Sequence, residues 1–185
     1  MSSKENFISK LHKAGYEHKK WLNSIKVLVS GMSVDKESIP LNEMDTPFGH
    51  WLYSDAMVFS TQSSKSVLED ISKLYTECYE SYLKIYGIMF AGKSNGFLSG
   101  LFSNNKASSS ELLLAQKYYE ELVVISDNLI KRMRTFENQM YATSNEKFDH
   151  LCPEASPASV QRTVEEADAV PEKVQRYYRG TLIEE

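Results

Sequence analysis

The stretch that decides the fold is residues 109–142, SSELLLAQKYYEELVVISDNLIKRMRTFENQMYA. Apolar and small residues recur in it every three or four positions, which is the spacing of one face of an α-helix. The positions of this stripe are Leu112, Ala115, Tyr119, Leu122, Ser126, Leu129, Met133, Phe136 and Met140. Because the stripe extends over about four heptads, we expect one long helix that packs in its own bundle. A homodimer through this helix is the alternative.

Two other segments, residues 7–31 and 67–88, have the same spacing. Their stripes are Phe7, Leu11, Ala14, His18, Trp21, Ile25 and Leu28 in the first, and Val67, Ile71, Leu74, Cys78, Ser81, Ile85 and Ile88 in the second. Between them, residues 47–59 are expected to form a further helix, because Asp-Thr-Pro at residues 45–47 is a helix-start signal. The sequence therefore predicts an all-α protein in which residues 1–142 form an up-down four-helix bundle.

The C-terminal segment, residues 143–185, lacks this periodicity. It contains Pro153, Pro157 and Pro171 among acidic and small residues, so we expect a flexible tail. Within the tail, residues 170–183 regain apolar positions and are a candidate partner-binding peptide.

Composition excludes several classes of protein. A net charge of −4 argues against a nucleic-acid-binding protein, which usually has a basic face. The two cysteines, Cys78 and Cys152, form no CxxC pair, and two cysteines make no disulfide framework, so a cytoplasmic location is expected. No stretch approaches the roughly 18 apolar residues of a membrane span, and the N-terminus has no signal-peptide pattern.

Two short motifs resemble those of a known family. They are the HxxW motif His18-Lys19-Lys20-Trp21 and the FGxW motif Phe48-Gly49-His50-Trp51. With their separation and the helical pattern, they make residues 7–89 similar to the chemoreceptor zinc-binding domain family. That family implies a helical bundle that acts in bacterial signal transduction and chemotaxis. It also implies a zinc ion held by a His in HxxW, a Cys two residues before FGxW and an HxxxH pair on the third helix.

Carried over residue by residue, the resemblance places these ligands at His18, Thr46, Tyr75 and Tyr79. Only His18 is a usual zinc ligand, because neutral threonine and tyrosine bind zinc poorly and tyrosine ionises near pH ~10. Tyr75 and Tyr79 belong to a tyrosine row that continues with Tyr82 and Tyr86. We therefore expect no zinc, and a buried His18 that is hydrogen-bonded to Tyr75 or Tyr79.

A rearranged zinc site is an alternative. His18, Asp45 and Cys78 would supply three ligands and His50 a fourth, because Asp45 and Cys78 each lie one residue from a family ligand position. A shift of one residue turns a helical side chain by about 100°, which argues against this site.

A phosphate-binding loop is a more remote alternative. Residues 87–94, GIMFAGKS, match the GxxxxGK[ST] pattern, with Lys93 as the phosphate-binding lysine. That loop requires a strand before it, whereas the preceding residues here have helical spacing.

The expected function is regulatory or sensory and not catalytic. No nucleophile motif accompanies any of the four histidines, His12, His18, His50 and His150. The expected partner is a signalling protein or a second copy of the chain. The alternative is an adaptor that binds through the long helix and the C-terminal peptide.

Overall fold

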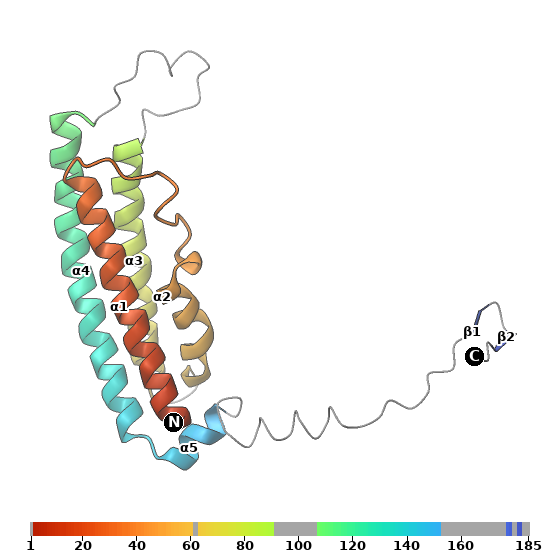
Figure 1. Cartoon of the computed structure of the whole chain (residues 1–185). Coiled ribbons are helices and arrows are strands. Elements are labelled where there is room, and N and C mark those ends of the chain that lie inside the picture. Colours follow the sequence, from red (N-terminus) through yellow and green to blue (C-terminus); the bar gives the residue numbers. More distant parts are fainter. Residues whose placement is uncertain (1, 61–62, 91–106, 153–176, 179–180, 183–185) are drawn as a thin grey trace.

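The computed structural model describes residues 2–60, 63–90, 107–152, 177–178 and 181–182, and this part of the chain is mostly helical, as predicted. Three long helices dominate it, α1 (Ser3–Val29), α3 (Lys65–Phe90) and α4 (Ser109–Ala142) (Figure 1). The shorter elements are η1 (Glu43–Asp45), α2 (Pro47–His50), η2 (Trp51–Asp55), η3 (Ala56–Phe59), α5 (Asn145–Leu151), and the two-residue strands β1 (Tyr177–Tyr178) and β2 (Thr181–Leu182).

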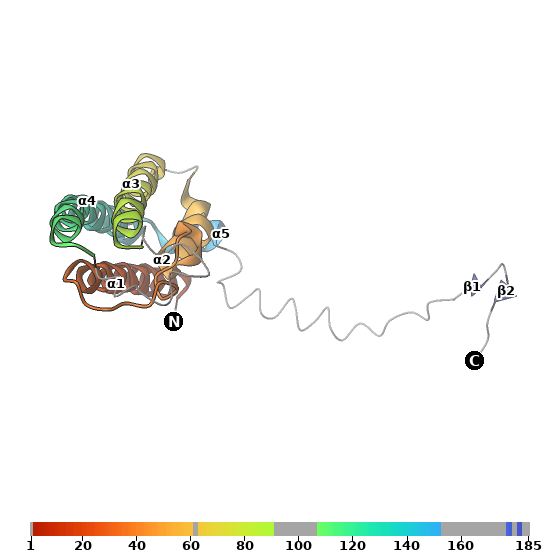
Figure 2. The ribbon, with the colours of Figure 1, turned by 90° about the horizontal axis from the view of Figure 1, so that it is seen from above.

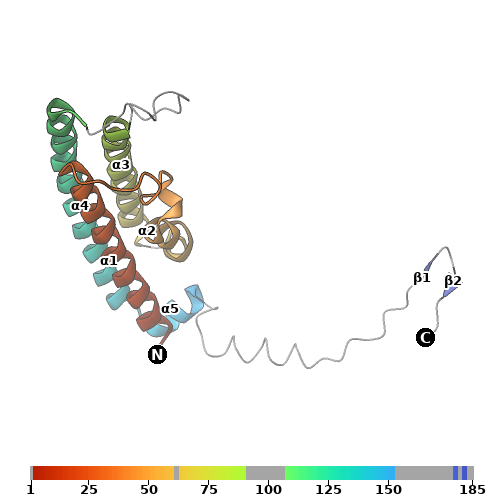
Figure 3. The ribbon, with the colours of Figure 1, turned by 45° about the horizontal axis from the view of Figure 1, so that its top comes forward.

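The long helices pack side by side, and α1 is antiparallel to α4. At one end of this pair, Lys4 Nζ donates hydrogen bonds to the carbonyls of Tyr141 (2.7 Å) and Thr143 (2.6 Å). At the other end, Gln116 Nε2 donates to the carbonyl of Val29 (3.2 Å). The segment from α2 to η3 lies beside α1 and α3 (Figure 2 and Figure 3). The core is therefore enclosed by helical elements from both halves of the chain.

Local signals in the sequence fix where the long helices begin and end. Ser2 and Ser108 are the N-caps of α1 and α4, and each forms a capping box with the glutamate three residues later. After α1, Gly31 has a φ of 79°, the left-handed conformation that glycine adopts at helix C-termini without strain. The predicted end of the first helix is thus confirmed.

The predicted stripes form most of the core. Four of their members are only half-buried: Leu74, Ile88, Leu112 and Tyr119. In α3 the buried surface is wider than the predicted stripe, because Tyr75, Tyr79 and Tyr82 are buried as well. They are buried because the chain between α1 and α2 covers this second face of α3 with its carbonyl groups.

The helix predicted over residues 47–59 is not continuous. It begins at Pro47 with Thr46 as its N-cap, as expected, but it passes into a π-helical turn at η2 and a 3-10 turn at η3. The hydroxyl of Ser54 donates to the carbonyl of His50, four residues earlier. A side chain that takes a backbone acceptor in this way weakens the regular helical ladder, which gives a physical reason for the change of helix type.

The bundle also extends past the predicted boundary at residue 142. Helix α5 follows α4, with Ser144 as its N-cap. Its Phe148 is fully buried and packs against Phe7 and Phe59, with ring centroids 5.5 Å and 5.1 Å apart. The predicted start of the tail at residue 143 is therefore wrong, because residues 145–151 form a helix whose Phe148 packs in the core. Farther on, β1 and β2 pair antiparallel, and the other residues of the candidate peptide 170–183 lie outside the described ranges.

Within the described ranges, no helix combines the length and the apolar composition that a membrane-spanning segment needs.

Gly49 is the position where the fold tolerates no side chain. A Cβ atom on Gly49 would lie 1.9 Å from the carbonyl oxygen of Glu43, which is backbone and has no flexible end to move aside. The exposed Gly87 in α3 has nothing within 4 Å of such an atom.

We expect Gly49→Ala to lower the free energy of unfolding by about 3 kcal/mol, because the Glu43 segment must move away from α2. The matched control, Gly87→Ala, should raise it by about 0.5–1 kcal/mol, because alanine favours a helix interior. Urea unfolding of both variants checks this. A Gly49→Ala variant as stable as the wild type would contradict the close approach.

Candidate functional site

The predicted tyrosine row attaches the chain between α1 and α2 to helix α3. The hydroxyl of Tyr75 donates to the carbonyl of Glu43 (2.9 Å), that of Tyr79 to Pro40 (3.2 Å) and that of Tyr82 to Ile39 (3.2 Å). Each bond engages a backbone carbonyl of this largely irregular segment, and the carbonyl of Glu43 also accepts from the backbone N–H of Thr46 (3.5 Å). The segment therefore has a fixed position although it is not a regular helix.

The carbonyl of Glu43 is the centre of this attachment. It accepts a hydrogen bond from the hydroxyl of Thr46 (3.0 Å) in addition to the one from Tyr75. The Thr46 and Tyr75 hydroxyls also lie within hydrogen-bonding distance of each other. Thr46 Oγ1 in turn accepts from the backbone N–H of Gly49 (2.9 Å), which caps α2. One small polar cluster thus positions the start of α2 against α3.

His18 lies next to this cluster but does not bond to it. Its Nε2 pairs with Ser126 Oγ of α4 at 2.9 Å, and its ring packs against Trp21 (centroids 5.4 Å apart) and Phe48 (5.3 Å). The expected hydrogen bond to Tyr75 or Tyr79 is therefore wrong. Both tyrosine hydroxyls donate to the segment between α1 and α2, whereas His18 bonds to Ser126, the small polar residue in the α4 stripe.

Burial keeps His18 neutral. Its side chain is 1% exposed, and desolvation lowers its pKa from the ordinary 6.5 to about 4. Its Nδ1 has no hydrogen-bond partner among the described residues. His18 therefore brings an uncharged imidazole to the centre of the bundle near neutral pH.

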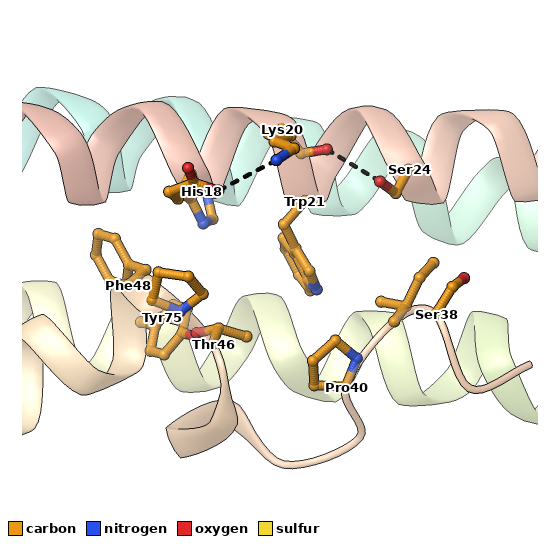
Figure 4. A pocket seen from close by; sticks show the side chains of 12 residues that line it. His18, Lys20, Trp21, Ser24, Ser38, Pro40, Thr46, Phe48 and Tyr75 are labelled. Atoms are coloured by element: carbon orange, nitrogen blue, oxygen red, sulfur yellow. Dashed lines mark hydrogen bonds and ion pairs between the residues drawn. The ribbon is translucent and has the colours of Figure 1, made fainter.

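A cavity of about 130 Å³ opens beside His18, between α1, α3 and residues 38–48 (Figure 4). Its inner walls are the predicted site residues His18, Trp21, Thr46, Phe48 and Tyr75, together with Ile39, and its rim is formed by Glu17, Lys20, Ser24, Ser38, Pro40 and Pro47. The sequence thus identified most of the inner wall. The FGxW residues Gly49 and Trp51 lie outside this lining, and Tyr79 supports it from behind by stacking on Trp21 (centroids 5.2 Å apart).

The donor atoms at this site do not fit a zinc ion. The hydroxyls of Tyr75 and Tyr79 donate to carbonyls, and burial raises the pKa of both well above the ordinary value for tyrosine. Thr46 Oγ1 is occupied by its own hydrogen bonds. Of the four positions that the resemblance indicates, only His18 offers a usual zinc ligand.

The rearranged set is not assembled either. The described residues contain no group of three or more His, Cys, Asp or Glu side chains that could hold a metal ion. Cys78 lies in the core, where burial raises its pKa to about 12, whereas Asp45 and His50 are exposed. The alternative site of His18, Asp45, Cys78 and His50 is therefore wrong, as the one-residue shift along the helix suggested.

The candidate phosphate-binding loop also lacks its required structure. Residues 87–90 belong to the last turn of α3, so a helix and not a strand precedes the second glycine. Lys93 and its neighbours lie outside the described residues.

Comparisons with known proteins identified no relative of this chain. A scan against protein-family models found no match, and searches of curated proteins and of solved structures found no significant match.

The burial of His18 predicts how stability depends on pH. In the unfolded chain His18 takes up a proton as the pH falls through about 6.5, but in the folded chain only near pH 4. Between these values the unfolded state binds more protons, so stability falls as the pH falls. We expect His18 alone to remove about 2 kcal/mol between about pH 7 and about pH 5.

Urea unfolding of the wild type and of His18→Gln at a series of pH values measures this effect. The variant should lose less stability than the wild type over the same range. Parallel pH profiles for the two proteins would show that His18 is not held neutral by burial.

Proposed function

We propose that this protein is a non-catalytic sensory bundle of bacterial signal transduction that receives a small ligand in the cavity beside His18. The observation that carries the proposal is the position of the cavity. Its walls come from α1, α3 and the chain between α1 and α2, so a ligand in it contacts all three at once. Such a site is concave, mostly apolar and provided with a few polar atoms, which is typical of small-molecule sites.

The signal would be a small shift of helices. The wall formed by residues 38–48 is attached to α3 through Tyr75 and Tyr79, whereas the wall formed by α1 is linked to α4 through the His18–Ser126 bond. A ligand that separates or draws together these walls changes the packing of α1 on α3 and α4. Shifts of this kind, on the order of 1–2 Å, are a common way for helical proteins to transmit binding.

The resemblance to the chemoreceptor zinc-binding domain supports the same proposal. Three residues of the two motifs, His18, Trp21 and Phe48, line the cavity. Gly49 permits the close approach of the Glu43 carbonyl to α2, which positions the cavity wall formed by residues 38–48. An up-down four-helix bundle with the α2–η3 segment as its second helix is part of this proposal. So are a signalling protein or a second copy of the chain as the partner and the cytoplasm as the location.

An adaptor function is the second candidate. It is favoured by exposed apolar side chains on α4, among them Leu113 and Val124, which are 68% and 62% exposed. An adaptor would bind its partner through this surface with no response to a small ligand.

A cavity-filling variant tests the sensory proposal. Ser24 lies at the rim, and its hydroxyl donates to the carbonyl of Lys20 (3.2 Å). In a separate groove between α3 and α4, Thr135 makes the same bond to Lys131 (3.2 Å). We expect a panel of small molecules to contain one that raises the melting temperature of the wild type and of Thr135→Met but not of Ser24→Met. At a hundredfold excess over Kd the stabilisation is about 2.7 kcal/mol, which corresponds to several degrees.

The same samples, measured by light scattering, report whether the ligand changes the association state. If every active molecule stabilises Ser24→Met as well as the wild type, the cavity is not the sensory site. If no molecule changes the melting temperature or the association state of the wild type, the result favours the adaptor function.

A further inference from the structure

The two tryptophans of the chain have the same unusual feature in different places. The indole nitrogens of Trp21 and Trp51 are both buried, and neither has a hydrogen-bond partner among the described residues. Trp21 lines the cavity, whereas Trp51 packs between Phe7, Phe48 and Phe136 in the core. In Figure 4 the indole nitrogen of Trp21 lies at the end of the ring that extends from α1 toward the chain that carries Ser38 and Pro40.

An indole N–H is only a donor, so what Trp21 lacks is an acceptor. A buried donor without an acceptor destabilises the protein, and an occupant of the cavity that offers an acceptor removes this penalty. The hydroxyls of Thr46 and Tyr75 are already engaged around the Glu43 carbonyl. An occupant of the cavity can supply the missing acceptor.

The charges around the cavity favour an uncharged occupant. His18 is neutral near pH 7 because of its burial. At the rim, Glu17 and Lys20 pair with each other at 3.7 Å, so neither sign of charge dominates there. A charged molecule would lose its hydration in an aromatic cavity without gaining a partner of opposite charge.

The size and the walls of the cavity favour a flat ring. An engineered cavity of roughly 150 Å³ in another protein binds benzene, and the present one is about 130 Å³. Its walls include the rings of His18, Trp21, Phe48 and Tyr75. Aromatic rings pack well against another ring in offset or edge-to-face contacts.

We propose that the cavity binds a small, uncharged heteroaromatic molecule whose ring nitrogen or carbonyl oxygen accepts a hydrogen bond from Trp21 Nε1–H. This inference rests on the proposed function in taking the same cavity as the binding place, and adds the chemical class of the ligand. His18 Nδ1, the second orphaned polar atom at the cavity, is available to a further polar atom of the same ligand.

Three small aromatic probes test the class: benzene has no acceptor, pyridine has one, and N-methylpyridinium has a methyl group on the ring nitrogen and a positive charge in place of the acceptor. They are added to the full-length protein at mildly alkaline pH, where pyridine is uncharged. The readout is the pair of indole N–H signals in a proton–nitrogen correlation spectrum, since the chain has only two tryptophans. Trp21→Phe and Trp51→Phe each remove one signal and so assign both.

We expect pyridine to shift the Trp21 signal downfield and to leave the Trp51 signal in place. Pyridine should bind about tenfold more tightly than benzene. In Trp21→Phe, pyridine and benzene should bind about equally. In Trp51→Phe the preference for pyridine should persist, because this matched control removes an unpartnered indole N–H that lies outside the cavity lining.

Equal affinity for benzene and pyridine in the wild type would overturn the inference, and so would tighter binding of N-methylpyridinium or no binding of any probe. The proposed function fails separately: if pyridine binds as expected but leaves the association state unchanged, the ligand class stands and the sensory role does not. If other molecules act through the cavity while pyridine and benzene bind alike, the sensory role stands and the ligand class does not.

Discussion

The carbonyl group of Glu43 is the acceptor on which the arrangement around the cavity depends. Tyr75 and Thr46 donate to it, and its oxygen would lie 1.9 Å from a Cβ atom on residue 49, so only glycine is compatible with this packing. Thr46 then caps α2 and so sets the direction in which Phe48 enters the core. A single backbone group thereby links α3 to the start of α2, and the cavity is the space that remains between this assembly and α1.

The second constraint is the neutrality of the interior. No carboxylate among the described residues pairs with His18, and the tyrosine hydroxyls beside it keep their protons because burial raises their pKa. At the positions where the resemblance places zinc ligands, the chain has uncharged hydrogen bonds and stacked rings. A polar cluster of this kind specifies one arrangement of the bundle, since each hydroxyl has one suitable carbonyl acceptor. It also leaves His18 Nδ1 and Trp21 Nε1 without hydrogen-bond partners among the described residues, which makes the cavity a place where a polar ligand gains hydrogen bonds.

Periodicity in the sequence could predict the long helices, because a stripe repeated over many turns reports one buried face. It could not predict that α3 buries a second face. Tyrosines are common on surfaces as well as in cores, and the carbonyls that hold them belong to a segment with no side-chain pattern. Helix α5 has too few turns for a stripe to be recognised, so Phe148 gave no signal by itself. Three residues of the two motifs, His18, Trp21 and Phe48, line the cavity, whereas the ligand positions taken from the family could not reveal Ser126. A polar residue in the α4 stripe and a histidine in the α1 stripe were the available signal for that pair.

The central claim is that Thr46 and Tyr75 act as one cooperative unit on the Glu43 carbonyl. A double-mutant cycle of Thr46→Val and Tyr75→Phe, measured by urea unfolding, tests it most directly. The account predicts a coupling free energy of about 1 kcal/mol or more, because each hydroxyl positions the acceptor that the other uses. In the same cycle with Tyr82→Phe, whose hydroxyl bonds to Ile39 instead, the effects should add. Additivity within about 0.3 kcal/mol for Thr46 and Tyr75 would contradict the claim and leave the two hydrogen bonds as independent contacts.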